Sequence, residues 1–488
     1  MPRTAGIGIQ NFEKIITIHN FYVDKTLFIK EWWESQDEVT LITRPRRFGK
    51  TLNLNMTERF FSVEYAGQGE IFKDLNIWKE EKYRRLQGTF PVISLSFAPV
   101  KGTGDFRQMK RLLCQVIAGC CSHYQFLQEA GLMNEKEREF FSAVSRDMDD
   151  DIAAMSLHML SKLLMRYYNK KVLIFLDEYD TPLQEAYVCG YWDEAAAFLR
   201  SFLNITFKTN PYLDRAVMTG ITRISKESIF SDLNNLSVVT AGSDKYAEAF
   251  GFTQEEVTAA LQEYGLSDME ECVRDWYDGF IFGTKEDIYN PWSIISFLNE
   301  KKLACYWANT SSNGLVNKLV QEGSRDVKTA MEDLLAGGTI CTGMDEQIVF
   351  SQLDENESAV WSFLLAGGYL KAVKHTFDPD TGNEKYVLKL TNKEVRMMFC
   401  SMIQVWFKGR GPAYNDFIRA LLSDDKKAMN YYMNQVALNT FSSFDTGNRP
   451  SAFAEPEQFY HGFVLGLLVE LSGRYVMTSN RESGFRTL

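Results

Sequence analysis

The sequence predicts an α/β fold whose centre is a doubly wound parallel sheet. Two observations indicate this class. Short β-like runs alternate with helical stretches through the N-terminal third of the chain, and residues 172–176 form a continuous apolar run. Such a run is typical of a central parallel strand that is covered on both faces, and strands that alternate with helices indicate βαβ units.

The elements can be placed one after another along the chain. The expected strands are residues 39–43, 91–97, 172–176 and 215–219, and the expected helices are residues 50–61 and a long helical stretch from about 106 to 168. Beyond about Gly251 the pattern becomes mostly helical, as far as about Leu335. Thr253, followed by Glu256 three residues later, predicts a helix start with a capping box.

Shorter elements are expected in the C-terminal half. Residues 347–350 and 386–390 are β-like, residues 378–383 read as a turn between two candidate strands, and residues 445–451 read as a linker. After the linker we expect one helix over residues 458–471 and one strand over residues 474–478.

Composition and charge exclude several classes of protein. Of the 488 residues, 45% are hydrophobic and 14% are aromatic, which excludes a disordered chain. The net charge is −11, so any nucleic-acid contact would need a local basic patch. The N-terminus lacks the pattern of a secretory signal, no apolar run is long enough to span a bilayer, and the eight cysteines show no Cys-x-x-Cys spacing. We therefore expect a cytoplasmic protein with reduced thiols and no membrane partner.

Residues 44–51, RPRRFGKT, end in the last three residues of the phosphate-loop pattern G-x-x-x-x-G-K-[ST]. Gly49 would let the backbone approach the phosphates, Lys50 would place an ammonium on the β- and γ-phosphates, and Thr51 would give a hydroxyl to magnesium at a helix N-terminus. Arg44 stands where the pattern has its first glycine. Because a strand precedes this segment and a helix follows it, we expect the segment to bind ATP with Mg²⁺.

Four neighbours of this triplet complete the candidate nucleotide-binding loop, namely Arg46, Arg47, Phe48 and Leu52. The arginines flank the loop, where a cation can meet the triphosphate or a carboxylate of a neighbouring subunit. They also invite a role in binding DNA phosphates, but the net charge favours the local role, with weak and steeply salt-dependent DNA affinity. The alternative for the whole segment is a solvated basic turn before an amphipathic helix.

Two acids, Asp177 and Glu178, follow the apolar run. A carboxylate at the C-terminal end of a buried parallel strand lies where open α/β sheets bind ligands. Asp177 would hold magnesium, and Glu178 would act as the general base that polarises the attacking water. The alternative is that Asp177 caps the next helix and that the other acids are solvated.

A third candidate element is the apolar run that ends at Thr219 and continues to Arg223. In ATPases with a glutamate base, a polar side chain at the end of the strand beside the acidic one senses the γ-phosphate, and Thr219 fits that position. Arg223 would neutralise transition-state charge in cis. The alternative is a core strand followed by an exposed basic turn.

Nine stretches resemble a family of bacterial AAA-ATPase-like proteins whose C-terminus carries a PD-(D/E)XK nuclease-like domain. They are YVDKT (22–26), TRPRRFGKTL (43–52), LDEYDTP (176–182), TGITRISKESIF (219–230), WYDG (276–279), YNPW (289–292), WANTSS (307–312), FYHGF (459–463) and SNRESG (479–484). Together they extend over almost the whole chain. The loop of the family resembles RPRRFGKT as well, so Arg44 agrees with the family.

The resemblance implies an AAA-like P-loop ATPase domain over residues 5–245, a mostly helical, winged-helix-like region over residues 246–445, and an incomplete α/β piece over residues 455–488 that is a truncated nuclease-like remnant. It also implies that Tyr22 and Asp24 lie near the nucleotide. The family is thought to act on nucleic acid or in mobile-element conflict. Nucleic acid or another protein is therefore a further expected partner, and an oligomer is left open.

The sequence departs from the family after residue 484. There the family continues into an aspartate-bearing strand and a Glu-x-Lys strand, which would bind magnesium for phosphodiester cleavage, whereas this sequence reads FRTL over residues 485–488. Farther upstream, Lys393 and Glu394 look like the start of a helix rather than part of a metal site. We therefore expect no nuclease activity from this chain.

The expected function is magnesium-dependent ATP hydrolysis that drives a conformational change linked to nucleic acid or mobile-element conflict. Two alternatives remain. One is a nucleotide-gated binding or signalling module with little turnover, and the other is an inactive remnant of an ATPase-nuclease. Turnover distinguishes the first two, and thermal stabilisation by ATP with magnesium distinguishes both from the third.

Overall fold

A five-stranded sheet forms the centre of the computed structural model, which describes residues 2–223, 229–230, 233–307, 314–343, 353, 356–377, 384–408, 420–421, 423–432, 482–483 and 486–487. The sheet has the order β2-β3-β4-β1-β5. Its strands are β1 (Val39–Thr43), β2 (Val92–Ser96), β3 (Val172–Asp177), β4 (Leu213–Gly220) and β5 (Leu236–Val239). All neighbouring strands of this sheet are parallel, which confirms the predicted α/β class.

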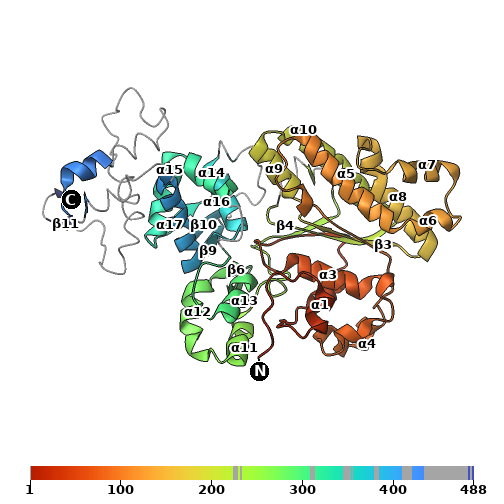
Figure 1. The fold of residues 1–488 in the computed structure, drawn as a ribbon, viewed down its shortest axis with the longest axis horizontal. Coiled ribbons are helices and arrows are strands. Elements are labelled where there is room, and N and C mark those ends of the chain that lie inside the picture. The colour runs from red at the N-terminus through yellow and green to blue at the C-terminus, as the bar shows by residue number, and fades with distance from the viewer. Residues whose placement is uncertain are drawn as a thin grey trace.

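Helices cover both faces of this sheet (Figure 1). One face carries α5 (Phe106–His123), α8 (Asp150–Tyr168) and α10 (Trp192–Leu203), and the other carries α1 (Phe12–Thr17) and α3 (Lys50–Phe61). Because both faces are covered, β1 and β3 are buried along their whole length. The shorter helices are α2 (Leu27–Ser35), α4 (Glu81–Arg84), α6 (Phe126–Glu129), α7 (Glu135–Ala143) and α9 (Thr181–Cys189).

The predicted strands and the helix over residues 50–61 are confirmed, with shifts of two residues or fewer at their ends. The helical stretch expected from about residue 106 to 168 divides into α5, α6, α7 and α8. Side-chain caps explain part of this division, because Asp105 caps α5 and Asn134 starts α7 with a capping box.

A second group of elements follows the sheet. It consists of α11 (Gln254–Tyr264), α12 (Glu270–Tyr277), the antiparallel hairpin β6 (Phe280–Phe282) and β7 (Lys285–Ile288), and α13 (Pro291–Glu300). The predicted capping box is confirmed, because the Thr253 hydroxyl accepts from the Glu256 N–H and the Glu256 carboxylate accepts from the Thr253 N–H. The hairpin was not predicted.

A third group surrounds a small antiparallel sheet of order β8-β10-β9. Its elements are α14 (Gly314–Glu322), α15 (Arg325–Leu335), β8 (Ile340–Thr342), α16 (Glu357–Ala366), β9 (Leu370–Phe377), β10 (Glu384–Leu390) and α17 (Lys393–Lys408). β10 confirms the β-like piece predicted over residues 386–390. α17 confirms the helix start predicted at Lys393 and Glu394.

One hydrophobic core extends from the parallel sheet into the third group. Its buried members include Phe12, Phe48, Phe280, Trp307 and Phe399. A smaller separate core joins Phe21 and Phe252 to residues of α11, α12 and α13. The main core therefore crosses residue 245, where the sequence predicts a domain boundary.

Several predictions lie outside the described residues. They concern the strand over 347–350, the turn over 378–383, the linker over 445–451, and the helix and strand over 458–471 and 474–478. Of the predicted remnant over 455–488, the structure describes only the paired two-residue strands β11 (Glu482–Ser483) and β12 (Arg486–Thr487). In the part of the chain that the structure describes, every helix is too short or too polar to cross a bilayer.

Candidate functional site

The candidate site lies at one edge of the parallel sheet, where β1, β3 and β4 end. Strand register sets this meeting point, because Thr43 pairs with Gly220 at the ends of β1 and β4, and Leu176 pairs with Met218 between β3 and β4. In open parallel sheets the carboxyl ends of the strands form the ligand-binding edge. The phosphate-loop segment, the acidic pair and Thr219 are therefore brought together at that edge.

The loop between β1 and α3 has two residues in the left-handed region, Arg47 with φ 64° and Gly49 with φ 81°. Gly49 adopts this conformation without strain, whereas it is unfavourable for the arginine. Within the described residues, no acceptor is found for the backbone N–H groups of residues 46–51. A run of free N–H groups at the start of a helix is a ready anion-binding concavity.

The side chain of Lys50 is buried and lies across the loop that precedes α3. Its ammonium donates hydrogen bonds of 2.8 Å to the carbonyl oxygens of both Arg44 and Pro45. Burial lowers the pKa of Lys50, and the neighbouring carboxylates of Asp177 and Glu178 oppose that shift. The ammonium of Lys50 is thus held by the loop and lies in the field of the two acids.

Asp177 joins the loop to β4 through two hydroxyl groups. Thr51 Oγ1 donates to Asp177 Oδ2 at 2.6 Å, and Thr219 Oγ1 donates to Asp177 Oδ1. Burial raises the pKa of Asp177, and these two hydrogen bonds counter the shift. The carboxylate of Asp177, at the end of β3, therefore connects the start of α3 with the end of β4.

The oxygens of Thr51 and Asp177 suit magnesium, a hard cation that prefers oxygen ligands. Among the described residues, no group of three or more His, Cys, Asp or Glu side chains could hold a metal without help. Magnesium generally takes one or two protein ligands together with phosphate oxygens and water. The donor set therefore fits a magnesium ion that arrives with a nucleotide.

Glu178 has a left-handed backbone, with φ 51°. Its N–H donates to Asp177 Oδ1 at 3.0 Å, and its carboxylate accepts a hydrogen bond of 3.0 Å from Thr181 Oγ1 at the start of α9. A strained backbone at a ligand-binding edge is a common feature of functional sites. The Glu178 side chain is half-buried beside the site, and its carboxylate accepts a hydrogen bond from one hydroxyl group, that of Thr181.

Sequence reasoning gave no role to Asp180, which the structure places at the centre of a buried network. Its Oδ2 accepts from the N–H groups of Ile221 and Thr222, at 3.0 and 2.9 Å, and from the Thr222 hydroxyl and the Gln184 amide, both at 2.8 Å. Asp180 thereby fixes the segment that follows β4. The acid lies within the LDEYDTP stretch, but its partners at 221 and 222 lie too far along the chain for spacing to reveal them.

Thr219 is fully buried at the end of β4, next to the acidic strand as predicted, and its hydroxyl is used on Asp177. Arg223 directly follows the segment that Asp180 fixes. Their roles in sensing phosphate and in neutralising charge stay predictions.

The three arginines of the loop differ in their surroundings. Arg46 is half-buried and approaches Gln184 Oε1 at 3.4 Å, on the side of the acids. Arg47 is exposed, with its guanidinium 4.4 Å from the ring centre of Trp292. Arg44 is buried.

Arg44 donates to the carbonyl oxygens of Thr43, Thr240 and Lys245, at 3.0, 2.6 and 3.3 Å. Its guanidinium lies 4.3 Å from the ring centre of Phe282 in β6. Burial lowers the pKa of Arg44 to about 9. The residue that replaces the first glycine of the pattern therefore ties the loop to the segment after β5 and to the β6–β7 hairpin.

Residues far along the chain hold the loop from outside, and we call them the clamp: Phe280, Phe282, Asn290 and Trp307. Phe48 packs against Phe280 and Phe282, with ring centres 4.8 and 5.5 Å apart. The carbonyl oxygen of Arg46 accepts from Asn290 Nδ2 at 3.2 Å and from Trp307 Nε1 at 3.0 Å. The conformation of the loop therefore depends on residues beyond the parallel sheet.

Leu52 lies in the first turn of α3 and packs at the edge of the main core. Its assignment to nucleotide binding stays a prediction.

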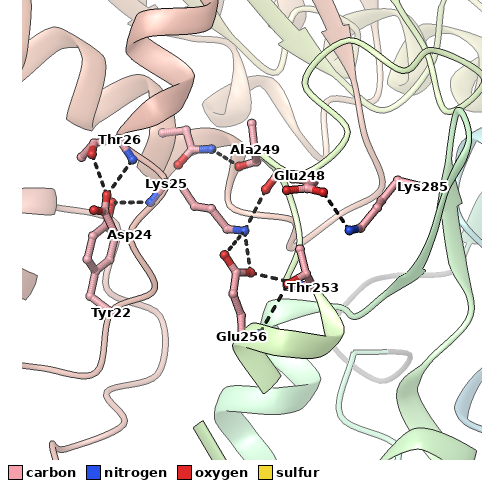
Figure 2. A network of polar contacts seen from close by, with 10 residues as sticks. Tyr22, Asp24, Lys25, Thr26, Glu248, Ala249, Thr253, Glu256 and Lys285 are labelled. Carbon is pink, nitrogen blue, oxygen red and sulfur yellow. Dashed lines mark hydrogen bonds and ion pairs between the residues drawn. The ribbon is translucent and has the colours of Figure 1, made fainter. Parts of the chain in front are cut away.

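Tyr22 and Asp24 lie in a polar network near α3 (Figure 2). The Tyr22 hydroxyl is 3.4 Å from the sulfur of Met56 in α3. Asp24 accepts from the N–H and hydroxyl of Thr26, at 2.9 and 2.6 Å, and from the Asn76 N–H at 2.7 Å. Both carboxylate oxygens are thus used within the chain, and the assignment of Tyr22 and Asp24 to nucleotide binding stays a prediction.

Lys25, the neighbour of Asp24, reaches in the opposite direction (Figure 2). Its ammonium donates to the carbonyl oxygen of Glu248 at 2.7 Å and pairs with the Glu256 carboxylate of α11 at 2.6 Å. Burial lowers the pKa of Lys25, and the Glu256 charge opposes that shift. This segment therefore joins the N-terminal part to α11.

Lys393 and Glu394 have structural partners. Lys393 pairs with Asp275 at 2.8 Å. Glu394 is buried and accepts from the Ser293 hydroxyl at 2.8 Å and from the Trp307 N–H at 2.6 Å. Glu394 therefore positions the backbone of a clamp residue.

Comparison with known proteins agrees with this geometry in the N-terminal part. Residues 6–230 match a family model described as a predicted AAA-ATPase. An uncharacterised protein in the vnfD 5′ region of Azotobacter chroococcum mcd 1 is 27% identical over 342 residues, which cover 70% of this chain. The match spans 60% of the length of that relative. The similarity supports nucleotide binding by the N-terminal part.

Proposed function

We propose that this protein binds ATP with magnesium at the loop of residues 44–51 and hydrolyses it. The observation that carries the proposal is the junction of Thr51, Asp177 and Thr219 beside a loop with free N–H groups. Hydroxyl and carboxylate oxygens suit magnesium, and the free N–H groups suit phosphate. A solvated basic turn would need neither a buried lysine nor a buried aspartate.

Binding is assigned to the loop and to the two magnesium ligands. The N–H groups of residues 46–51 and the ammonium of Lys50 would bind phosphate oxygens. Thr51 and Asp177 would hold magnesium, which when bound neutralises the charge that develops on the phosphates. Thr219 would keep Asp177 in position through its hydroxyl.

We assign the hydrolysis step to Glu178, Arg46 and Arg223. The Glu178 carboxylate would orient the attacking water and accept its proton. Arg46, on the acid side of the loop, and Arg223, after the segment held by Asp180, would stabilise negative charge in the transition state. The Thr181 hydroxyl donates to Oε2 of Glu178, which leaves Oε1 for the attacking water.

We further propose that hydrolysis moves the clamp against the parallel sheet. Asn290 and Trp307 donate to the carbonyl oxygen of Arg46, so a change in the loop backbone alters two hydrogen bonds to the clamp. The clamp is in turn connected to α17, because the backbone N–H of Trp307 donates to the carboxylate of Glu394. We propose that the resulting motion serves a process that involves nucleic acid or mobile-element conflict.

Lys50→Ala tests the binding site. Charge-assisted hydrogen bonds of this kind contribute about 1.5–3 kcal/mol, so ATP affinity should fall roughly ten- to hundredfold. Calorimetry with Mg-ATP measures this change, and Lys171→Ala, an exposed lysine just before β3, is the matched control. Equal ATP affinity in wild type and Lys50→Ala would place the nucleotide elsewhere.

A nucleotide-gated binding module with little turnover is the second candidate. The hydrogen bond from Thr181 to the Glu178 carboxylate favours it, because that bond occupies one acceptor position of the proposed base. ATP with magnesium would then raise the unfolding temperature while multiple turnovers stay near background. Steady release of phosphate by the wild-type chain would exclude this candidate.

A further inference from the structure

The β9–β10 hairpin places four lysines on one face. Cross-strand partners share a face, and the register pairs Lys371 with Lys389, Lys374 with Val387, and Thr376 with Lys385. Residues 385, 387 and 389 alternate along β10 and so point to one side. The irregularity between Val387 and Leu388 keeps Lys374 on the same side as Lys371. We call Lys371, Lys374, Lys385 and Lys389 the lysine face.

The opposite face of the hairpin is the apolar one. Leu370, Leu388 and Leu390 are buried there against the main core. Glu384, the acid at the start of β10, also faces that side and lies 3.5 Å from His375. No acid of the described strands therefore lies between the four lysines.

The lysine face is open to solvent and unpaired within the described residues. Lys374, Lys385 and Lys389 are exposed, and Lys371 is half-buried at the base. None of them forms an ion pair with a described residue. Among the described residues, Asp278, Asp287 and Glu286 attract Lys371 without forming an ion pair, Lys389 repels it, and burial lowers the pKa of Lys371.

The lysines of this face repel one another, and Asp278, Asp287 and Glu286 offset the effect of Lys389 on Lys371. Lys371 and Lys389 are direct cross-strand partners, and like charges in that position destabilise a sheet. The chain as a whole carries a net charge of −11, so general composition does not account for a cluster of positive charge. A polyanionic partner would remove the repulsion.

The shape of the hairpin selects nucleic acid among polyanions. Lys385 and Lys389 are about 13 Å apart along an extended strand, so the face offers a row of cations rather than a pocket for one phosphate. A two-stranded ribbon fits the major groove of a duplex and the phosphates at its edges. The helix before the hairpin does not compete for this role, because residues 359–364 of α16 are all buried.

We propose that the lysine face binds the phosphate backbone of duplex nucleic acid, with the hairpin rather than α16 as the contacting element. The inference rests on the nucleic-acid part of the proposed function but uses a surface separate from the ATP site. Contacts of this type are insensitive to base sequence and sensitive to salt.

The test compares two triple variants of equal charge change. Lys374→Glu/Lys385→Glu/Lys389→Glu alters the lysine face, and Lys136→Glu/Lys171→Glu/Lys208→Glu alters three exposed lysines on the sheet domain. Fluorescence anisotropy with a mixed-sequence DNA duplex at low salt, without nucleotide, measures binding by the full chain. We expect DNA affinity to fall at least tenfold in the first variant and less than about threefold in the second. The slope of log affinity against log salt concentration should fall in magnitude by about 2 to 3 in the first variant alone.

Three outcomes would overturn the proposal: no binding of DNA or RNA duplexes by the wild-type chain, equal losses in the two variants, or retention of binding in the first. A wild-type chain that binds anionic lipid vesicles but no duplex would assign the face to another partner. Circular dichroism verifies that both variants fold, and the milder Lys374→Gln/Lys385→Gln/Lys389→Gln gives a second reading. ATP hydrolysis without DNA should be unchanged in the first variant, so failure here is distinguishable from failure of the ATPase proposal.

Discussion

Asp177 receives two hydroxyl hydrogen bonds, from Thr51 and from Thr219, while Glu178 beside it receives one from Thr181. The two acids are adjacent in sequence but differ in accessibility, since Asp177 is buried and Glu178 is half-buried. A buried acid with fixed partners suits a metal ligand, and a more accessible acid suits proton transfer. This difference supports separate roles for the two residues.

Glu178→Gln should separate binding from chemistry. The amide keeps the size of the side chain but removes the base, so turnover should fall by roughly 10²-fold or more while ATP affinity changes little. Asp177→Asn is the companion variant and should instead raise the magnesium concentration needed for binding. Phosphate release and calorimetry measure the two effects. Wild-type turnover in Glu178→Gln would leave Glu178 with a structural role only.

Asp278 should make stability depend on pH. Burial, together with the charge and hydrogen bond of Asp287, raises the pKa of Asp278 from 3.8 to about 6. The folded chain therefore binds more protons than the unfolded chain in this interval, so the contribution of Asp278 to stability falls as pH rises from 3.8 to about 6. Above that interval the penalty is fully present.

Asp278→Asn removes this ionisation, so the variant should be more stable than wild type above about pH 7, and its advantage should shrink as pH falls toward about 4. Urea denaturation at several pH values gives the comparison. Asp268→Asn, at an exposed acid, is the control and should show no such trend. An advantage that is independent of pH would show that Asp278 does not titrate in this range.

Among the elements, the central strands were the most predictable. β1 and β3 are continuous apolar runs because both faces are covered, and such runs are visible in sequence. The residues of the candidate site that end these strands could be named for the same reason. The β6–β7 hairpin could not, since its strands are short and β7 begins with three consecutive charged residues.

The clamp was not predictable either, because its contacts join distant parts of the chain. Trp307 and Arg46 are 261 positions apart. The acceptor of the hydrogen bond between them is a backbone carbonyl oxygen, so neither residue composition nor motif spacing can predict it. Arg44 illustrates the same limit. Its position in the pattern could be read, but its three carbonyl partners could not.

Trp307→Phe should test the clamp as an element. The substitution keeps an aromatic ring next to Phe280 and Tyr369 but removes the N–H donor to the Arg46 carbonyl. Loss of a hydrogen bond worth about 1 kcal/mol should weaken ATP binding by roughly threefold to tenfold. Trp276→Phe, at a half-buried tryptophan of α12, is the control. Unchanged affinity in Trp307→Phe would mean that the clamp does not set the binding conformation of the loop.

At the scale of the molecule, three groups of elements share two cores and a small number of polar joints. The main core includes residues of the parallel sheet and of α17, and the Lys25–Glu256 pair joins the N-terminal part to α11. Nucleotide-dependent changes at the loop would therefore be felt in all three groups. Positive charge is gathered on the lysine face, while the chain as a whole is acidic.

The clamp has a consequence for how this chain can be divided. All the motif residues of the candidate ATP site lie before residue 230, yet Asn290 and Trp307 supply donors to the loop, and Phe280 and Phe282 shield Phe48. A fragment that ends at residue 245 would keep the motif residues but would lose the clamp. The ring of Phe48 would then be uncovered beside the loop. The candidate ATP site is in this sense built from two segments, and recombination that exchanged one of them would have to exchange both.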